Sequence, residues 1–148
     1  MSDPAIRAIL LAEDSPADAE MAMDALAEAN LLNPIVHVHD GVDALDYLYA
    51  RGKHAGRSGG DPAVLLLDIK MPRMDGLEVL QQMRQDERLR RIPVVMLTSS
   101  REESDLARSW DLGVNAYVVK PVDINQFFTA VQTLGRFWAV MNETPGEP

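Results

Sequence analysis

Cysteine is absent from all 148 residues of this chain. Its absence excludes a disulfide framework and a thiolate metal site. Apolar runs long enough to cross a bilayer are also missing, and the N-terminal Met1–Ala5 lacks the basic and apolar regions of a signal peptide. We therefore expect a cytoplasmic protein without a membrane segment.

An excess of positive charge is lacking as well. The formal net charge is −9, and the basic residues are scattered apart from the segment Arg84–Arg91. An acidic surface repels a phosphate backbone, so nucleic acid is not an expected partner. The length suits one ordinary domain with a substantial core, and we expect neither a second domain nor an internal repeat.

Short apolar runs alternate with helix-prone segments along the chain. Strands are expected within the runs 6–12, 34–39, 63–67, 93–97 and 116–119. Helices are expected at 18–30, around 42–48, around 77–83, at 102–112 and after Asp123, which caps the last one. Continuous Val, Leu and Ile runs are typical of strands that are buried on both faces. The pattern predicts a doubly wound α/β domain, with a five-stranded parallel sheet flanked by five helices.

One segment fits this alternation poorly. Arg51–Asp61 is rich in glycine and is longer than most connections between a helix and a strand. We interpret it as a flexible insertion.

Polar residues follow four of the five predicted strands. They are Glu13 with Asp14, Asp68, Thr98 with Ser99, and Lys120 with Pro121. Ligands of open α/β sheets bind beyond the carboxyl ends of the strands. Carboxylates, a hydroxyl and an ammonium group are therefore expected to meet at one edge of the sheet.

This combination of groups predicts phosphoryl transfer. Clustered carboxylates repel one another and need a cation, and Mg²⁺ prefers oxygen ligands. A carboxylate can attack phosphorus to give an aspartyl phosphate. The metal, ammonium and hydroxyl groups would then stabilise the phosphoryl oxygens. Singly, each residue also has a structural interpretation: Asp14 or Thr98 in a helix cap, Asp68 in a turn, and Lys120 as a solvated side chain.

The chain resembles the response-regulator receiver family. The matching motifs are Glu13-Asp14, the segment Leu67–Gly76, the segment Met96–Ser99, and Val119-Lys120-Pro121. The resemblance covers about residues 5–141, which we take as the receiver domain, with 142–148 as a short flexible tail. It implies a flavodoxin-like fold with strand order 2-1-3-4-5.

The resemblance also implies a role for each matching residue. Asp68 would accept a phosphoryl group from a histidine kinase, and Thr98 would be the switch hydroxyl. Lys120 would pair with the phosphoryl group and precede a cis peptide bond, and Tyr117 would be the switch aromatic. The metal ligands would be Asp14, Asp68 and the Lys70 backbone carbonyl, with Glu13 acting directly or through water. Such a protein is not an enzyme beyond its own phosphorylation and slow dephosphorylation.

The C-terminal residues carry two further expectations. Residues 134–143 look like a subgroup of stand-alone receivers that pair with histidine kinases, including bacterial phytochromes. On the last helix, Ile124, Phe127, Val131 and Trp138 would face the sheet. A second apolar stripe, formed by Ala130, Leu134, Phe137 and Met141, suggests a homodimer, although another helix or the tail would also cover it.

Three other functions compete with this interpretation. A flavodoxin-like electron carrier shares the fold, but Glu13 and Asp14 would repel a flavin phosphate. A Mg²⁺-dependent phosphatase with an aspartyl nucleophile needs a second carboxylate two residues after the nucleophile, where Lys70 stands. An adaptor with the receiver fold but without phosphotransfer stays open, although the complete acidic set argues against it.

Overall fold

The computed structural model describes residues 7–29, 31–58, 60–114 and 116–132, with side chains described through residue 130. The strands are β1 (Ile9–Ala12), β2 (Ile35–Val38), β3 (Val64–Asp68), β4 (Val94–Thr98) and β5 (Ala116–Val119). The helices are α1 (Pro16–Glu28), α2 (Gly41–Leu48), α3 (Gly76–Arg84), α4 (Arg101–Ser109) and α5 (Ile124–Gln132), with short 3-10 helices η1 (Gly52–His54) and η2 (Leu89–Arg91). The strands form one parallel sheet in the order β2-β1-β3-β4-β5, which confirms the predicted architecture.

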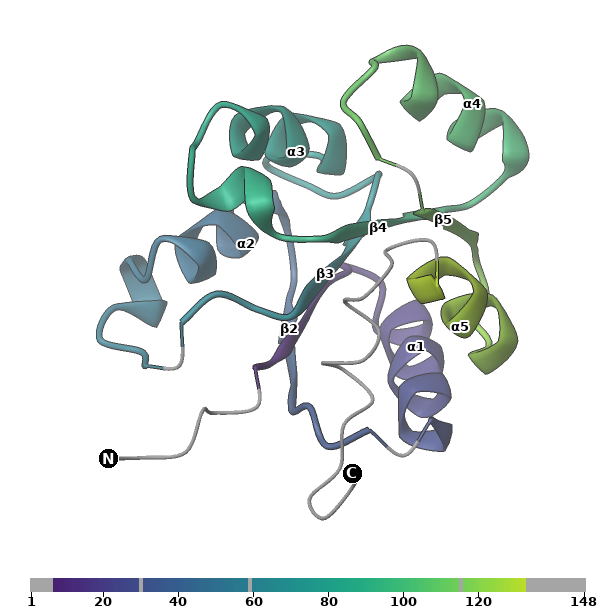
Figure 1. The fold of residues 1–148 in the computed structure, drawn as a ribbon, viewed down its shortest axis with the longest axis horizontal. Helices are drawn as coiled ribbons and strands as arrows, with labels where there is room; N and C mark the ends of the chain where they lie inside the picture. Colours follow the sequence, from purple (N-terminus) through teal and green to yellow (C-terminus); the bar gives the residue numbers. More distant parts are fainter. Residues whose placement is uncertain (1–6, 30, 59, 115, 133–148) are drawn as a thin grey trace.

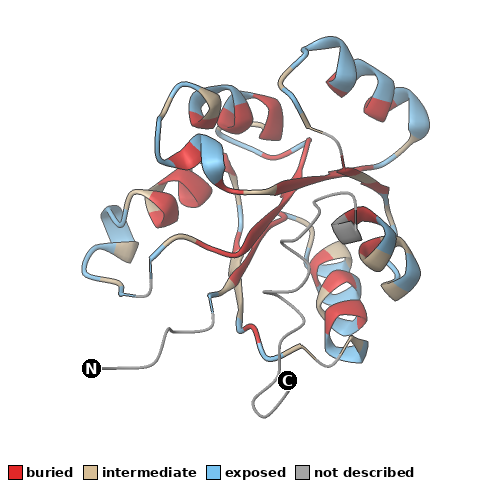
Figure 2. Ribbon diagram, viewed as in Figure 1, coloured by how far each residue is buried: buried red, intermediate tan, exposed pale blue. Residues whose placement is uncertain are grey.

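Two helical layers enclose this sheet (Figure 1). Helices α2 and α3 lie on one face with α4 beside them, and α1 and α5 cover the other face. Every residue of β1, β3 and β4 is buried, whereas the outer sides of the helices are exposed (Figure 2). Burial on both faces explains why these strands read as continuous apolar runs instead of alternating ones.

The ends of the elements are set by local capping. Helix α1 begins at Pro16 because the Ser15 side chain accepts the Asp18 amide, so the cap is Ser15 and not Asp14. Helix α4 begins at Arg101 behind Ser100 and ends at Ser109, three residues before the predicted end. The Asp123 carboxylate accepts the Gln126 amide at 2.8 Å at the start of α5, as predicted.

The segment 51–61 is more ordered than the sequence suggested. It contains η1, and the Arg57 guanidinium donates to the carbonyl oxygens of Tyr47 and Leu48 while it stacks on the Tyr47 ring. At the far end, Arg88 forms an ion pair with Asp61. These contacts hold the described part of the segment against α2.

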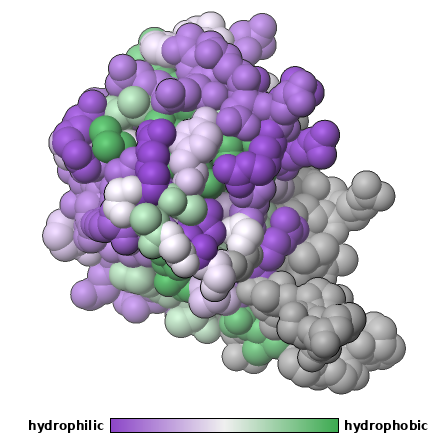
Figure 3. Space-filling view, turned by 90° about the vertical axis from the view of Figure 1, so that its left-hand side faces the viewer, coloured by the Kyte–Doolittle hydropathy of each residue, from purple (hydrophilic) through white to green (hydrophobic). Residues whose placement is uncertain are grey.

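The face of the molecule drawn in Figure 3 is largely hydrophilic, with only scattered hydrophobic side chains. Within the described ranges, no helix has the length and apolar content that a membrane span would require.

Candidate functional site

Three carboxylates meet at the carboxyl end of the sheet. Glu13 and Asp14 directly follow β1, and Asp68 is the last residue of the neighbouring β3. Each of these residues offers a carboxylate oxygen, and the oxygens all lie within 4.8 Å of one another. Glu13 and Asp68 are buried, whereas Asp14 is exposed. The predicted convergence of carboxylates at the strand ends is therefore found, with one of the three open to solvent.

Glu13 is fixed from three directions. Its Oε2 accepts the Ser15 amide at 3.1 Å, its own amide donates to the Val38 carbonyl, and its carbonyl oxygen lies 2.7 Å from His37 Nε2. The residue is thus tied both to the start of α1 and to the edge strand β2. The Ser15 amide and the Lys120 ammonium hold the buried Glu13 carboxylate near Asp68, so the acidic cluster is preorganised.

The loop after Asp68 folds closely over the end of β3. The Gly76 amide donates to the Ile69 carbonyl at 2.7 Å, and a Cβ atom added at Gly76 would lie 2.2 Å from the Asp68 carbonyl oxygen. Only glycine fits at this approach. Arg73, which has a φ of 64°, makes two hydrogen bonds to the Asp40 carboxylate and ties the loop to α2.

Lys120 extends into the acidic cluster from the end of β5. Its Nζ lies 3.3 Å from Asp68 Oδ1, 3.2 Å from Glu13 Oε1 and 3.0 Å from Asp18 Oδ2. Its peptide bond to Pro121 is cis, as the resemblance to the receiver family implied. Asp18 was missed as a site residue, although its place in the first turn of α1, just after Glu13 and Asp14, was the available signal.

The charges of this site perturb one another. The pKa of Asp68 is raised to about 7, first by burial and then by the adjacent Glu13 carboxylate, while Lys120 acts in the opposite direction. Burial alone would lower the pKa of Lys120, but its bonds to Asp18, Asp68 and Glu13 give a net increase. The cluster therefore holds more negative charge than Lys120 compensates.

An oxygen-rich cluster of this kind fits a hard divalent cation. Carboxylate oxygens are the ligands that Mg²⁺ prefers, and one exposed ligand leaves room for retained waters. The Asp14, Asp68 and Glu13 carboxylates would hold the ion. The Lys70 carbonyl, the remaining expected ligand, stays a prediction.

Thr98 is the last residue of β4, the neighbour of β3, and Ser99 follows it; both contact the start of α4. Thr98 is fully buried, and its Oγ1 lies 2.8 Å from Ser104 Oγ. The Ser99 amide donates to Glu103 Oε1 at 2.7 Å, and Glu103 Oε2 lies 3.6 Å from Lys70 Nζ. Sequence reasoning missed Ser104 and Glu103, because nothing in a helix-forming segment marks which of its polar residues turn inward.

Tyr117, in the middle of β5, is half-buried and lies under a residue of α4. The Arg108 guanidinium carbon lies 3.9 Å from the centre of the Tyr117 ring, a cation–π contact. The ring borders a hollow of about 370 Å³ that Asn125, Gln126 and Thr129 of α5 also line. Among the described residues, the Tyr117 ring therefore lies between the Arg108 guanidinium and this hollow.

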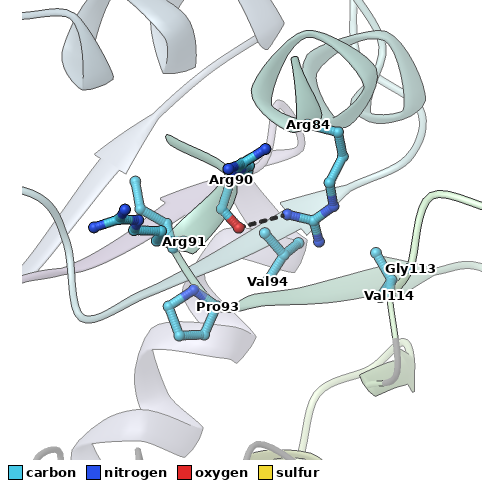
Figure 4. A pocket seen from close by; sticks show the side chains of 8 residues that line it. Arg84, Arg90, Arg91, Pro93, Val94, Gly113 and Val114 are labelled. Carbon is cyan, nitrogen blue, oxygen red and sulfur yellow. Dashed lines mark hydrogen bonds between the residues drawn. The ribbon is translucent and has the colours of Figure 1, made fainter. Parts of the chain in front are cut away.

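A second hollow lies at the opposite end of β4, away from the carboxylates (Figure 4). Arg84, Arg90 and Arg91 line it together with Pro93, Val94 and Gly113. The Arg84 guanidinium donates to the carbonyl oxygens of Leu112 and Arg90 at 2.7 and 3.1 Å, which joins α3 to η2 and to the chain before β5. We therefore assign Arg84 a structural role.

Comparison with known proteins decides the family. The response regulator receiver domain family matches residues 9–132. The chain belongs to this family. The fold and the acidic residues at the strand ends are therefore those of a receiver domain. Members of this family signal through phosphorylation of an aspartate.

Individual relatives match the chain over most of their own length. The probable methanogenesis regulatory protein FilR2 of Methanothrix harundinacea is 40% identical over 144 residues, which are 97% of this chain and 90% of that protein. The response regulator Rcp1 of Synechocystis is 36% identical, covering 89% and 88% of the two chains. Its Mn²⁺-bound crystal structure superimposes with a TM-score of 0.71 at 35% identity, over 96% of this chain and 99% of that one.

A bacteriophytochrome response regulator is more similar still. The structure of AtBRR has a TM-score of 0.89 and 59% identity, and the match covers 95% of this chain and 100% of that chain. The receiver described here is thus related to the response regulators of phytochromes.

Proposed function

We propose that this receiver accepts a phosphoryl group on Asp68 from a sensor histidine kinase, with Mg²⁺ held by Glu13, Asp14, Asp68 and the Lys70 carbonyl. The observation that supports this most directly is the buried Asp68 carboxylate, which lies 3.3 Å from the Lys120 ammonium inside a cluster of three carboxylates. The Glu13 and Asp14 carboxylates and the Lys120 ammonium all lie close to Asp68, which supports Asp68 as the nucleophile.

The chemistry assigns a part to each group. A carboxylate oxygen of Asp68 forms a bond to phosphorus while the phosphorus–nitrogen bond to the kinase histidine breaks, and the electron pair leaves with the imidazole. Lys120 would pair with the phosphoryl oxygens, since it already lies beside Asp68. Bound Mg²⁺ would supply positive charge to the same oxygens and offset the repulsion among the carboxylates.

The switch would follow from the new phosphoryl oxygens. Thr98 would turn its hydroxyl toward them, and Tyr117 would leave its present position beside Arg108. The changed surface around α4, β5 and α5 would then be read by protein partners. Relatives named as bacteriophytochrome response regulators support a phytochrome as the kinase.

Three further expectations stay proposals. We propose a receiver domain at 5–141 with a tail at 142–148, and a cytoplasmic location. We also propose a homodimer through the final helix. Its stripe of Leu134, Phe137 and Met141 lies outside the described residues, as do Trp138, the Val131 side chain and residues 134–143. Of that stripe the structure describes Ala130, which is buried in the core beside Phe127.

Intact-mass measurement after incubation with acetyl phosphate and Mg²⁺ tests the acceptor. Wild type should gain one phosphoryl mass, and the gain should be lost in Asp68→Asn and with EDTA. Equal labelling of Asp68→Asn would move the acceptor elsewhere, and no labelling of wild type by any donor would favour the adaptor. Turnover of phosphate esters would favour the phosphatase.

A further inference from the structure

The first turn of α4 carries side chains that accept hydrogen bonds from the end of β4. Ser104 Oγ lies 3.3 Å from the Ser100 carbonyl oxygen, to which only the serine hydroxyl can donate. A serine hydroxyl has one proton, so when Ser104 donates to Ser100, Thr98 is the donor in its 2.8 Å bond with Ser104. The Thr98 hydroxyl that the proposed switch needs is in any case already engaged by Ser104.

Glu103 engages one more donor and one cation at the same place. Its Oε1 accepts the Ser99 amide, and its Oε2, which lacks a hydrogen-bond partner, lies 3.6 Å from the Lys70 ammonium. In a capping box the third helical residue would accept the amide of the cap residue Ser100, one position later. The Glu103 carboxylate thus contacts Ser99 and Lys70, which lie outside α4, instead of the cap residue of its own helix.

Apolar packing adds little to the contacts that hold α4 against the sheet. Of the described α4 residues, Glu103, Ser104 and Ala107 are buried, so alanine is the one apolar side chain among them. Leu106 and Trp110 point outward, with 57% and 41% of their surface exposed. The position of α4 consequently depends on polar contacts to Thr98, Ser99 and Lys70, and on the stacking of Arg108 on Tyr117.

We propose that Glu103 and Ser104 are resident acceptors that compete with the phosphoryl group for the donors of Thr98, Ser99 and Lys70. The inference rests on the proposed function of Asp68. A phosphoryl group brings anionic acceptor oxygens to the same edge of the sheet and draws these donors away from α4. The two residues act as positioning residues, because they set how readily α4 releases Thr98.

Beryllofluoride with Mg²⁺, a mimic of the aspartyl phosphate, tests this without turnover. Ser104→Ala removes a contact that exists only in the resting state, so the mimic should bind about five-fold more tightly. Glu103→Gln keeps an acceptor for the Ser99 amide but loses the attraction to Lys70, so it should strengthen binding about two-fold. Amide NMR titration of the described residues gives the affinities.

Matched variants distinguish the proposed competition for donors from a general effect of substitutions in α4. Ser109→Ala removes a hydroxyl whose bond among the described residues stays within the helix, to the Leu106 carbonyl, and Glu102→Gln removes an exposed charge from the first turn of α4. Both should bind as wild type, as should Ser104→Thr, which keeps the hydroxyl. In a Thr98→Ala background, Ser104→Ala should have no effect, which a merely structural role for Ser104 would not predict.

The outcomes separate the two proposals. Mimic binding by wild type with unchanged affinity in Ser104→Ala and Glu103→Gln overturns the competition and leaves Asp68 as acceptor. The same gain in Ser109→Ala, or a gain that persists without Thr98, overturns it as well. Failure of wild type to bind the mimic while acetyl phosphate also leaves it unlabelled counts against the proposed function itself.

Discussion

Lys120 Nζ lies 3.3 Å from Asp68 Oδ1, and the same ammonium group lies within 3.2 Å of both Glu13 and Asp18. One cation thus bridges side chains from β3, the end of β1 and the first turn of α1. Because the lysine side chain is only 15% exposed, water screens these pairs weakly. Its position depends on a set of carboxylates and not on Asp68 alone.

Removing this ammonium group should slow phosphoryl transfer. Lys120→Ala leaves the Asp68 carboxylate but withdraws the charge that pairs with the phosphoryl oxygens. We expect labelling by acetyl phosphate to slow by at least about ten-fold. Lys53→Ala removes an exposed lysine that pairs with Asp43 and serves as the control. Labelling of Lys120→Ala at the wild-type rate would contradict a role for Lys120 in the reaction.

Substitution of Thr98 should separate phosphorylation of Asp68 from the change around Tyr117 that follows it. Thr98→Ala keeps the nucleophile and the metal ligands, so it should be phosphorylated within about two-fold of the wild-type rate. The change around Tyr117, followed by NMR of that ring, should be lost because no hydroxyl remains to engage the phosphoryl group. A wild-type response of Tyr117 in this variant would show that Thr98 is not the switch.

Without bound metal, the ionised Asp68 carboxylate should lower the free energy of unfolding. The pKa of Asp68 is raised to about 7 mainly by burial, so its charged form destabilises the fold at neutral and higher pH. Asp68→Asn should therefore be more stable than wild type in EDTA by about 1–3 kcal/mol, measured by urea unfolding. Added Mg²⁺ should stabilise wild type more than the variant.

The exposed Asp24→Asn on α1 supplies the control for this measurement, with little effect expected in either buffer. A metal-free Asp68→Asn less stable than wild type, or an equal response of both proteins to Mg²⁺, would be incompatible with ion binding at the carboxylate cluster.

The lifetime of the phosphoryl group should depend on Lys70. Ser100, two residues after Thr98, caps α4 and brings no carboxylate to orient a hydrolytic water. A lysine at 70 can shield the phosphoryl group once it leaves Glu103, so we expect slow hydrolysis. Lys70→Asn should lose its label sooner, and Glu103→Gln should keep it about two-fold longer, because Lys70 is released from its ion pair. Equal decay in all three proteins would remove Lys70 from this role.

A buried carboxylate away from the site predicts how stability changes with pH. Asp43 accepts the His39 amide at 3.1 Å and lies 2.8 Å from His54 Nε2. Burial alone would raise its pKa, but bonds to His54, His39 and Lys53 lower it below 3.8. A lowered carboxyl pKa stabilises the fold above the unfolded value, and this stabilisation is lost as the pH falls through the folded one.

Asp43→Asn should therefore cost about 1–3 kcal/mol at pH 7 in urea unfolding, with a smaller cost below pH 3.8. Asp46→Asn, which loses a partly exposed pair with Arg51, should cost less at pH 7. A cost for Asp43→Asn that does not change with pH would contradict the assignment.

The sequence predicted the sheet, and the meeting of polar side chains at its edge, for one physical reason. Strands buried on both faces are continuous apolar runs, and the residue that ends each run is placed at the same edge by the parallel sheet. This rule alone was enough to place Asp68, Thr98 and Lys120 together at the carboxyl end of the sheet.

Contacts that come from helices were not predictable by this route. Asp18, Glu103 and Ser104 reach the site from first turns, where their inward direction depends on the capping residue that starts the helix. The caps Ser15 and Ser100 moved both helix starts by one or two residues from the expected positions. A shift of one residue turns a helical side chain by about 100°, enough to change which residue faces the strand ends.

The most direct test of the account locates the phosphoryl group on the chain. Wild type labelled with acetyl phosphate and Mg²⁺ is treated with borohydride, which reduces an acyl phosphate to an alcohol, and its peptides are sequenced by mass spectrometry. Homoserine in place of aspartate at position 68, absent when EDTA is present, is the predicted result. Homoserine at Asp14 or Asp75 with an unmodified Asp68 would contradict it.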